Sequence, residues 1–399
     1  MGNGRNKSGS DIRQMAIALL LIALMVTAST AVTAGKGGKP GKPADDGGPL
    51  GSDYYTNECG FDDSTIIWPA SEKEKGSSST TRLFAFDLGP NRMYNDDDDG
   101  AIIVLGTPAY TGRFDIQGDH IVWTEFGPPN PEGRTNCDLY YWEFDSDEVI
   151  SDDNGERAGL QLSTTFAEVD PNVWGDNVVF QTYPVDYETT PPPFTYYIRN
   201  FDDEDAVKLV GVTYVEVWDN YLAIQEADGD NAIVDLGTNG KFDGFSSDVP
   251  TYYPDLQGRS LNRFEYGCAI YKLKDEQDGT YDWMYLMLDT SSGDFDGPTE
   301  LSYGTDARGV METNGKVIAY EVPSTKKGRY VYDIGLYFLD GTTPKEQQIT
   351  DCPRYWAWVQ DIDSTRLMYT YRGLMNFYHF DTGTHEKLSE AQAETQWKG

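Results

Sequence analysis

Two loops rich in Asp and Asn carry the side chains best suited to hold a cation. Each begins with Asp-Leu-Gly and has an Asn four residues after the Asp, and the first continues into one Asn and four Asp at 95–99. Ca²⁺ takes about six to eight oxygen ligands, which Asp and Asn in a Gly-containing loop can supply. We therefore predict Ca²⁺ as a stabilising cofactor, and the expected metal ligands are Asp87, Asn91, Asn95 and Asp97 in the first loop and Asp235, Asn239 and Asp243 in the second.

The spacing in these loops departs from the EF-hand pattern. The third position is Gly in both loops, and neither has Glu at the twelfth position. In the alternative interpretation, the Asp and Asn side chains only form the turn that follows a strand, where they bond nearby backbone N–H groups. The sequence leaves both interpretations open.

No set of catalytic residues stands out. His120, His379 and His385 have no partner at metal-ligand spacing, so we expect ordinary structural roles for them. The sequence contains no G-x-S-x-G, H-E-x-x-H, P-loop or G-x-G-x-x-G motif, which argues against an α/β-hydrolase site among other classes. A glycosidase-type pair of carboxylates stays open, because 66 acidic residues offer too many pairs to choose from. We name no catalytic residue and favour a protein without catalytic activity.

The charge of the chain excludes some partners. The 66 acidic and 31 basic residues give a formal net charge of −35. Binding to nucleic acid requires a basic face for the phosphates, and anionic membrane surfaces attract basic segments in the same way, so neither partner is expected. The acidic excess fits a solvated surface, cation binding or a salty habitat.

The N-terminus has the three parts of an export signal. Basic residues precede an apolar run at 15–26, and small residues follow up to Ala34. We predict a signal peptide at 1–34, cleaved after Ala34 or else after Ala31, and a flexible Gly, Pro and Lys-rich linker at 35–53. The expected location is extracellular or at the cell surface, or the periplasm of a two-membrane bacterium. An uncleaved membrane anchor is the alternative.

Two strand-like landmarks recur along the rest of the chain. One is an apolar segment that ends in a large residue, and its seven copies end roughly 44 to 57 residues apart. The second, which ends in Asp, follows each copy of the first. The copies of the first landmark end at Trp68, Trp123, Phe180, Ile224, Tyr271, Tyr320 and Tyr369.

The repeat predicts an all-β fold, a β-propeller of seven four-stranded blades at 54–390 followed by a tail at 391–399. Units of about 45 to 50 residues with four short strands cannot bury their faces alone and stack radially. Six or eight blades, or an array of β-sandwiches, are the alternatives. We interpret the segment 116–125, "IQGDHIVWTE", as one inner strand in which Trp123 belongs to the core.

The segments "GDHIVWTE" and "GDNVVF", with their following strands "DLYYWEFDSDE" and "YYIRNFDDED", resemble the repeats of TolB-like propellers of secreted bacterial and archaeal surface proteins. The resemblance covers roughly residues 54–390 and implies the propeller fold. It implies no catalytic motif, because the repeat encodes packing.

The propeller gives a hint about the four cysteines. An exported chain meets oxidising conditions, which permit disulfides. Cys59 lies in the first blade and Cys352 at the start of the last, which become neighbours when the ring closes, so we predict a disulfide between them. Cys137 and Cys268 fall in distant blades and are expected to be separate buried thiols.

Two long loops rich in Pro and Tyr, at 183–197 and 246–259, are expected to project from the ring. Exposed Tyr rings can stack on sugars or anchor a protein. We therefore name Tyr196, Tyr197, Tyr252 and Tyr253 as candidate ligand-binding residues. Loops that fold over the blade edges and protect them are the alternative.

These observations favour an exported, non-catalytic module for binding or assembly, with a protein or polysaccharide as its partner and with self-assembly possible. The first alternative is a secreted carbohydrate-active enzyme, a lyase or glycosidase with its site at the mouth of the propeller channel. The second is a structural subunit of a surface layer or extracellular filament.

Overall fold

The computed structural model describes the part of the chain between Cys59 and Lys387, with gaps. The described stretches are 59–72, 80–90, 92, 103–105, 110–118, 120–126, 137–143, 159–160, 166–184, 194–203, 205–257, 259–274, 281–301, 311–326, 328–339, 346–352, 356–371 and 374–387. The predicted signal peptide, linker and C-terminal tail lie outside them, as do Asn91, Asn95 and Asp97. None of the described segments is a helix with the length and apolar character needed to cross a membrane.

Seven antiparallel sheets of four strands each form the seven blades of a propeller, and each blade uses four strands that are consecutive in the chain. The prediction of seven blades is confirmed. The strands of blades 1 to 4 are β1 (Gly60–Asp62), β2 (Thr65–Glu72), β3 (Thr80–Asp87), β4 (Ile103–Val104), β5 (Tyr110–Gln117), β6 (His120–Phe126), β7 (Cys137–Glu143), β8 (Gly159–Leu160), β9 (Phe166–Trp174), β10 (Asn177–Pro184), β11 (Thr195–Asn200), β12 (Val207–Leu209), β13 (Val212–Trp218), β14 (Tyr221–Glu226), β15 (Asn231–Asp235) and β16 (Thr251–Tyr252).

Blades 5 to 7 complete the ring. Their strands are β17 (Ser260–Glu265), β18 (Cys268–Lys274), β19 (Tyr281–Asp289), β20 (Asp294–Glu300), β21 (Glu312–Thr313), β22 (Val317–Lys326), β23 (Arg329–Phe338), β24 (Glu346–Gln348), β25 (Ala357–Ile362), β26 (Arg366–Tyr371), β27 (Leu374–His379) and β28 (Thr384–Lys387). Two 3₁₀ turns, η1 (Gly237–Asn239) and η2 (Pro254–Leu256), are the described helical segments.

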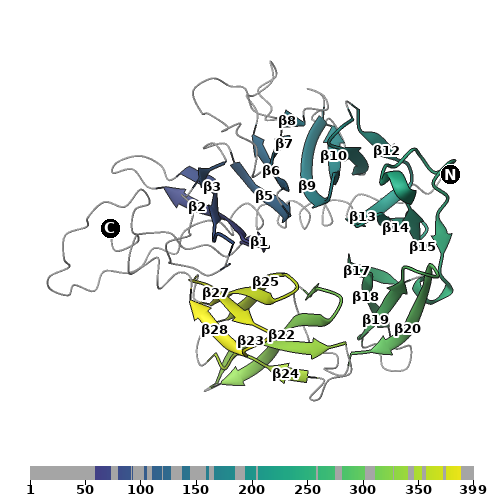
Figure 1. Cartoon of the computed structure of the whole chain (residues 1–399). Helices are drawn as coiled ribbons and strands as arrows, with labels where there is room; N and C mark the ends of the chain where they lie inside the picture. The colour runs from purple at the N-terminus through teal and green to yellow at the C-terminus, as the bar shows by residue number, and fades with distance from the viewer. Residues whose placement is uncertain are drawn as a thin grey trace, which may run out of the picture. The chain divides into compact units, whose positions relative to one another are not determined.

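The first strand of each blade faces the axis of the ring (Figure 1). Neighbouring first strands contact one another, as β1 does with β5 and β25, and β13 does with β9 and β17. The core lies between blades, where one cluster joins Val179 and Ile198 of blade 3 to Val217, Leu222 and Val234 of blade 4. Because both faces of a blade are covered by its neighbours, its middle strands are apolar on both sides.

The recurring apolar landmark is the second strand of each blade, not the inner one. Residues 116–125 contain the end of β5, the turn at Gly118 and most of β6, so the interpretation of this segment as one inner strand was wrong. Gly118 has a φ of 61°, a conformation that glycine adopts without strain. The second strand is the stronger landmark because it lies within the sheet and between blades, whereas the inner strand borders the axis. Trp123 is fully buried, as predicted.

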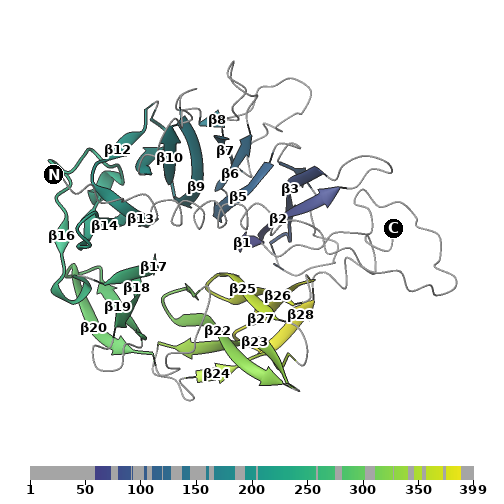
Figure 2. The same cartoon turned by 180° about the vertical axis from the view of Figure 1, so that it is seen from behind.

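Among the described strands, none is shared between blades 1 and 7 where the ring closes, since β1–β4 and β25–β28 form separate sheets. β1 lies beside β25 in both views of the ring (Figure 2). The backbone N–H of Cys59 donates to Oε1 of Gln360 at 2.9 Å, and that of Phe61 donates to Oδ2 of Asp361 at 2.9 Å. We call this contact the seam.

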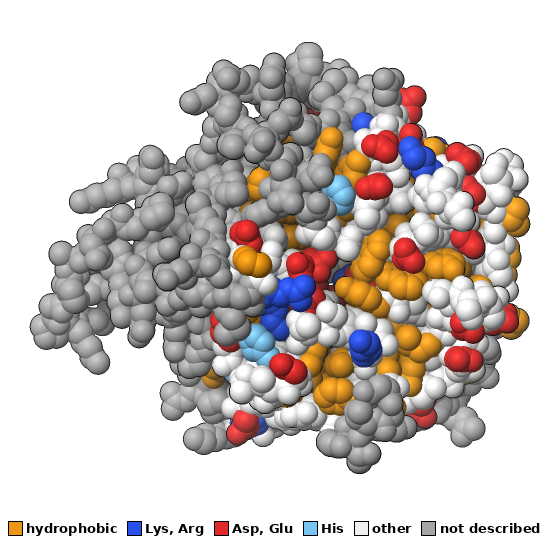
Figure 3. Space-filling model, in the orientation of Figure 1, with side chains coloured by type: hydrophobic (Ala, Val, Ile, Leu, Met, Phe, Trp, Pro, Cys, Tyr) orange, Lys and Arg blue, Asp and Glu red, His pale blue; other side chains and the backbone are white. Residues whose placement is uncertain are grey.

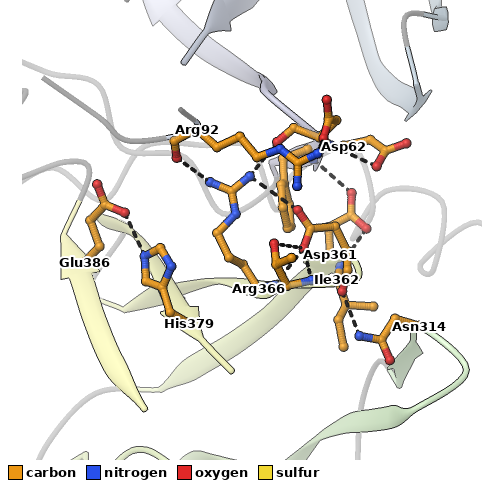
Figure 4. Close-up of polar contacts among 12 residues, drawn as sticks. Asp62, Arg92, Asn314, Asp361, Ile362, Arg366, His379 and Glu386 are labelled. Atoms are coloured by element: carbon orange, nitrogen blue, oxygen red, sulfur yellow. Dashed lines mark hydrogen bonds and ion pairs between the residues drawn. The ribbon is translucent and has the colours of Figure 1, made fainter. Parts of the chain in front are cut away.

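Arg366 is the buried cation of the seam (Figure 4). Its Nη1 donates to the carbonyl of Arg92 at 2.8 Å, and its Nη2 donates to the carbonyl of Asp63. Nη2 also lies 3.3 Å from Oδ2 of Asp363, and the guanidinium sits 4.3 Å from the centre of the Phe377 ring. Arg366 thus ties blade 7 to backbone carbonyls of the first repeat by charge-assisted hydrogen bonds.

Candidate functional site: the axial cavity

Bulges shape the inner strands where they line the axis. The register of β13 shifts between Val212 and Tyr214, that of β17 between Leu261 and Arg263, and that of β25 between Val359 and Asp361. β5 and β9 also have a shifted register against their partner strands. A bulge adds a residue, bends the strand and redirects its side chains. The bulges therefore help to determine which side chains these inner strands direct to the axis.

One position of the repeat links each of four blades to the next. Its side chain accepts a hydrogen bond from the backbone N–H of the next inner strand. The bonds are Asp361 to Phe61 N at 2.9 Å, Asp115 to Val173 N at 2.7 Å, Asn172 to Val217 N at 3.0 Å, and Glu216 to Phe264 N. These side chains satisfy backbone groups between blades, so their first role is to hold the ring together.

A second position, two residues further along, adds links at the turns. Oδ2 of Asp62 accepts from Gly118 N at 2.5 Å, and Oε1 of Gln117 accepts from Gly175 N at 2.7 Å. These bonds reach from the end of one inner strand to the turn of the next blade. We call these polar side chains around the axis the polar ring. Most of them hold neighbouring blades together.

Blade 5 places a cation in the ring where its neighbours place carboxylates. Arg263 lies 2.8 Å from Glu265, 2.5 Å from Glu312 and 3.6 Å from Glu216. Burial alone would lower the pKa of Arg263, but the three carboxylates raise it well above its usual value. Arg263 is therefore a permanent cation that bridges blades 4, 5 and 6.

Burial raises the pKa of several carboxyl groups in this ring. It raises the pKa of Asp115 to about 7 against the opposing Val173 N–H, and that of Glu216 to about 7 against the opposing Arg263 charge. Burial and the nearby Glu312 raise the pKa of Asp361 well above its usual value. Such groups hold their protons near neutral pH, which makes the interior of the ring less negative than its composition indicates.

A cavity of about 750 Å³ lies among these strands. Among the described residues, seven carboxyl groups and two guanidinium groups line it, so this ionisable lining is mainly acidic. Figure 3 shows acidic and basic side chains gathered at the middle of the described face, bordered by hydrophobic ones. The charged lining residues are Asp62, Arg113, Asp115, Asp170, Glu216, Arg263, Glu265, Glu321 and Asp361.

None of these lining carboxylates was among the site residues predicted from the sequence. Yet in six of the seven blades a residue with positive φ follows the inner-strand position three residues later, which is a local signal. Examples are Gly118 after Asp115, Gly175 after Asn172 and Gly315 after Glu312. An alignment of the seven repeats on this turn places the residues of each position of the polar ring in one column. It would not have separated structural side chains from those available to a ligand.

The predicted Ca²⁺ ligands that the structure describes bond their own loops. Oδ1 of Asp87 accepts from Gly89 N at 2.8 Å, and Oδ1 of Asp235 accepts from Gly237 N at 2.8 Å. These are Asx turns after a strand. Lys241 N donates to Asn239 at 3.3 Å, and Asp243 N donates to Asp248 at 2.6 Å. No group of three or more His, Cys, Asp or Glu side chains suited to a metal occurs within the described stretches.

The four named tyrosines do not form one surface. Tyr196 and Tyr197 belong to β11, where Tyr196 is buried at the cavity and accepts from Gln181 at 2.8 Å. Tyr252 is exposed and donates to Glu226 at 2.9 Å, while Tyr253 donates to the carbonyl of Gly293. Of the four, the structure brings Tyr196 alone to the cavity wall.

The cysteines are all buried, and the structure has no Cys59–Cys352 disulfide. Cys352 is a free thiol that packs between blades 6 and 7, and burial raises its pKa to about 11. Cys59 packs on the other side of blade 7, in the seam. The two blades are neighbours as predicted, but the two side chains lie in different inter-blade clusters. Cys268 is also a free buried thiol.

Solved structures share this fold. No protein-family model matches the sequence, and no curated protein matches it by sequence. The chain is similar to the β-propeller domain of the Trilobed protease from Pyrococcus furiosus, with 9% identity, a TM-score of 0.55, and coverage of 84% of this chain and 95% of that domain.

Two peptidases also contain a similar propeller. An acylaminoacyl peptidase from Pyrococcus horikoshii has 10% identity and a TM-score of 0.53, and a puromycin-hydrolyzing peptidase from Mycobacterium tuberculosis has 11% identity and a TM-score of 0.51. Each match covers 86% of this chain, which spans 53% and 55% of the two peptidases. At these identities the likeness shows the fold.

These likenesses correct the functional expectation drawn from the sequence. A non-catalytic binding or assembly module stood first there, yet the solved propellers described above are parts of peptidases. The two alternatives, a carbohydrate-active enzyme and a surface-layer subunit, have no counterpart among those three structures. The expectation failed because the repeat encodes packing between blades and carries no information about what a propeller accompanies.

Proposed function

We propose that this chain is a peptidase-associated propeller: it joins a peptide-hydrolysing domain or subunit and limits which substrates reach it. One observation carries the proposal, namely that the chain matches 95% of the propeller domain of the Trilobed protease. We assign hydrolysis to the associated peptidase, because the sequence contains no G-x-S-x-G motif.

The axial cavity supports this role. Its volume of about 750 Å³ falls within the range of roughly 300 to 1,000 Å³ that is usual for sites that bind small molecules. An extended peptide segment fits such a space, and a folded domain does not. A rigid ring of this kind acts as a size filter.

Co-purification tests the association. The full chain, tagged and expressed in its source cells, is cross-linked and isolated, and the bound proteins are identified by mass spectrometry. We expect a peptidase to be enriched, and we expect that enrichment to be lost when the seam is broken by Arg366→Met. Reproducible isolation of the folded chain without a peptidase would contradict the proposal.

Two properties predicted from the sequence accompany this proposal. We propose that the chain is exported by its N-terminal signal and is of the TolB-like type, and that a protein is its partner at the cell surface. N-terminal sequencing of the mature protein would test the cleavage at Ala34. We also keep Ca²⁺ as a proposed stabilising ion, which predicts a lower melting temperature in the presence of a chelator.

A further inference from the structure

Glu321 lines the cavity but makes none of the well-formed hydrogen-bonded links between blades that other lining carboxylates make. It lies in β22 and is 1% exposed, and among the described residues of blade 6 it is the one that lines the cavity. Within the described part of the chain, neither of its oxygens has a hydrogen bond of normal geometry, although the backbone N–H of Val359 is directed to it and lowers its pKa in part. The other lining carboxylates each bond a backbone N–H or an arginine. A buried carboxylate without a well-formed hydrogen bond costs stability, and a ligand that neutralises it would recover that cost.

The repeat itself does not require an acid at this position. Glu321 directly follows Tyr320, the large residue that ends the apolar landmark. The corresponding residues of the other six blades are Pro69, Thr124, Gln181, Gln225, Lys272 and Thr370. None of them is acidic, so packing of the second strand does not explain Glu321.

An aromatic side chain also lines the cavity, and further rings pack against it. Trp358 of β25 lines the cavity and packs against Tyr332, with 5.7 Å between ring centres, and against Trp356, with 5.2 Å. Trp356 and Tyr330 are 44% and 49% exposed. β22 contacts β25 directly, which places the wall of rings next to the strand that carries Glu321. The rings therefore form a continuous path from the surface to the cavity.

We propose that this part of the cavity binds the basic side chain, Arg or Lys, of an extended peptide, with Glu321 as its counter-charge and Trp358 as its aromatic wall. The aliphatic stem of such a side chain packs on aromatic rings while its charged head is attracted to their faces. This inference rests on the proposed function, in which peptides enter the ring, and it names the class of peptide.

The charge of the cavity favours the same ligand. Its two cations are already engaged, Arg113 by Asp170 at 3.0 Å and Arg263 by Glu265 at 2.8 Å. A bound cation would therefore meet a described lining in which carboxyl groups outnumber guanidinium groups, and its charge would favour the ionised form of those carboxyls. A single carboxylate beside aromatic rings suits an organic cation better than a metal ion, because hard metal ions require several oxygen ligands.

A matched pair of peptides tests the inference. Both are N-acetylated and C-amidated and carry a neutral fluorophore, and they differ only by one central Arg or citrulline, which has the same shape without the charge. Fluorescence anisotropy measures their binding to the full chain without a peptidase. We expect about tenfold tighter binding of the Arg peptide. Glu321→Gln should remove this preference, whereas Glu300→Gln, an exposed change on β20, should keep it.

Three results would overturn the inference. The first is equal binding, or no binding, of the two peptides to the wild-type chain. The second is a preference that survives Glu321→Gln in a variant with a normal melting curve. The third is binding of peptides only when their amino terminus is free, which would make the terminus the ligand. The assay contains no peptidase, so its failure is distinguishable from failure of the co-purification.

Discussion

Replacement of Glu321 by Gln should stabilise the protein increasingly as the pH rises. Burial raises the pKa of Glu321 from 4.5 to about 8, opposed only in part by the Val359 backbone N–H. The folded state therefore holds this proton more tightly than the unfolded state. Protonated Glu321 does not lower the free energy of unfolding below pH 4.5. As the pH rises from 4.5 towards 8, the free energy of unfolding falls, because the unfolded state releases this proton first.

The magnitude follows from the shift. One pKa unit corresponds to about 1.4 kcal/mol, so wild type should lose about 3 kcal/mol between pH 4.5 and 7 through this group. Gln has the same shape, keeps an oxygen for the Val359 N–H and has no proton to lose. The difference in free energy of unfolding between Glu321→Gln and wild type should therefore grow by about 3 kcal/mol over this range.

Urea unfolding at pH 4.5 and at pH 7, at one ionic strength, measures the difference. Other carboxyl groups with a raised pKa, such as Asp115 and Glu216, are common to both proteins and cancel in the comparison. Glu300→Gln serves as the control and should give a constant difference at both pH values. Parallel curves for wild type and Glu321→Gln would refute the reasoning, because Glu321 would then be solvated or paired in the folded state.

Further predictions concern the seam, the polar ring and the cavity. Arg366→Met should lower the free energy of unfolding by about 3–5 kcal/mol in urea, because it leaves Asp363 buried without its cation. A change smaller than about 1 kcal/mol would mean that the apolar cluster alone stabilises the seam. Asp361→Ala should lower the free energy of unfolding by about 1–3 kcal/mol, because the hydrogen bond from Phe61 N is lost. Asp361→Asn keeps an acceptor and should lower it less. Equal decreases for the two variants in thermal unfolding would contradict a hydrogen-bonding role. Affinity for the Arg peptide should rise by up to about tenfold per pH unit between pH 6 and 8, because binding ionises Glu321; affinity independent of pH in the anisotropy assay would remove Glu321 from the site.

The fold was predictable from the sequence because packing between blades repeats. The second strands, such as those ending at Trp123 and Phe180, lie in similar apolar surroundings in every blade and so have similar sequences. The inner strands were misassigned because their side chains differ from blade to blade. Asp115, Asn172 and Glu216 perform one role with three residue types, so no single motif marks them.

The candidate site could not be predicted in the same way. What distinguishes Glu321 from dozens of other acidic residues is burial without a hydrogen bond of normal geometry, which depends on how β22 packs against blade 7. Conversely, the Asp-rich loops were conspicuous in the sequence, yet Asp87 and Asp235 have a local role in ending a strand. The sequence composition indicates many acidic residues that could form a site. Only their packing shows which of them have a local structural role and which line a cavity.

The most direct test of peptidase association is to compare two substrates of the associated peptidase. One is a short unstructured peptide, and the other is a folded protein that carries the same cleavage sequence in an exposed loop. We predict that the full chain lowers kcat/KM for the folded protein at least about tenfold and leaves that for the peptide within about twofold, because the cavity admits extended segments only. An equal effect on both substrates, or no effect on either, would contradict the account.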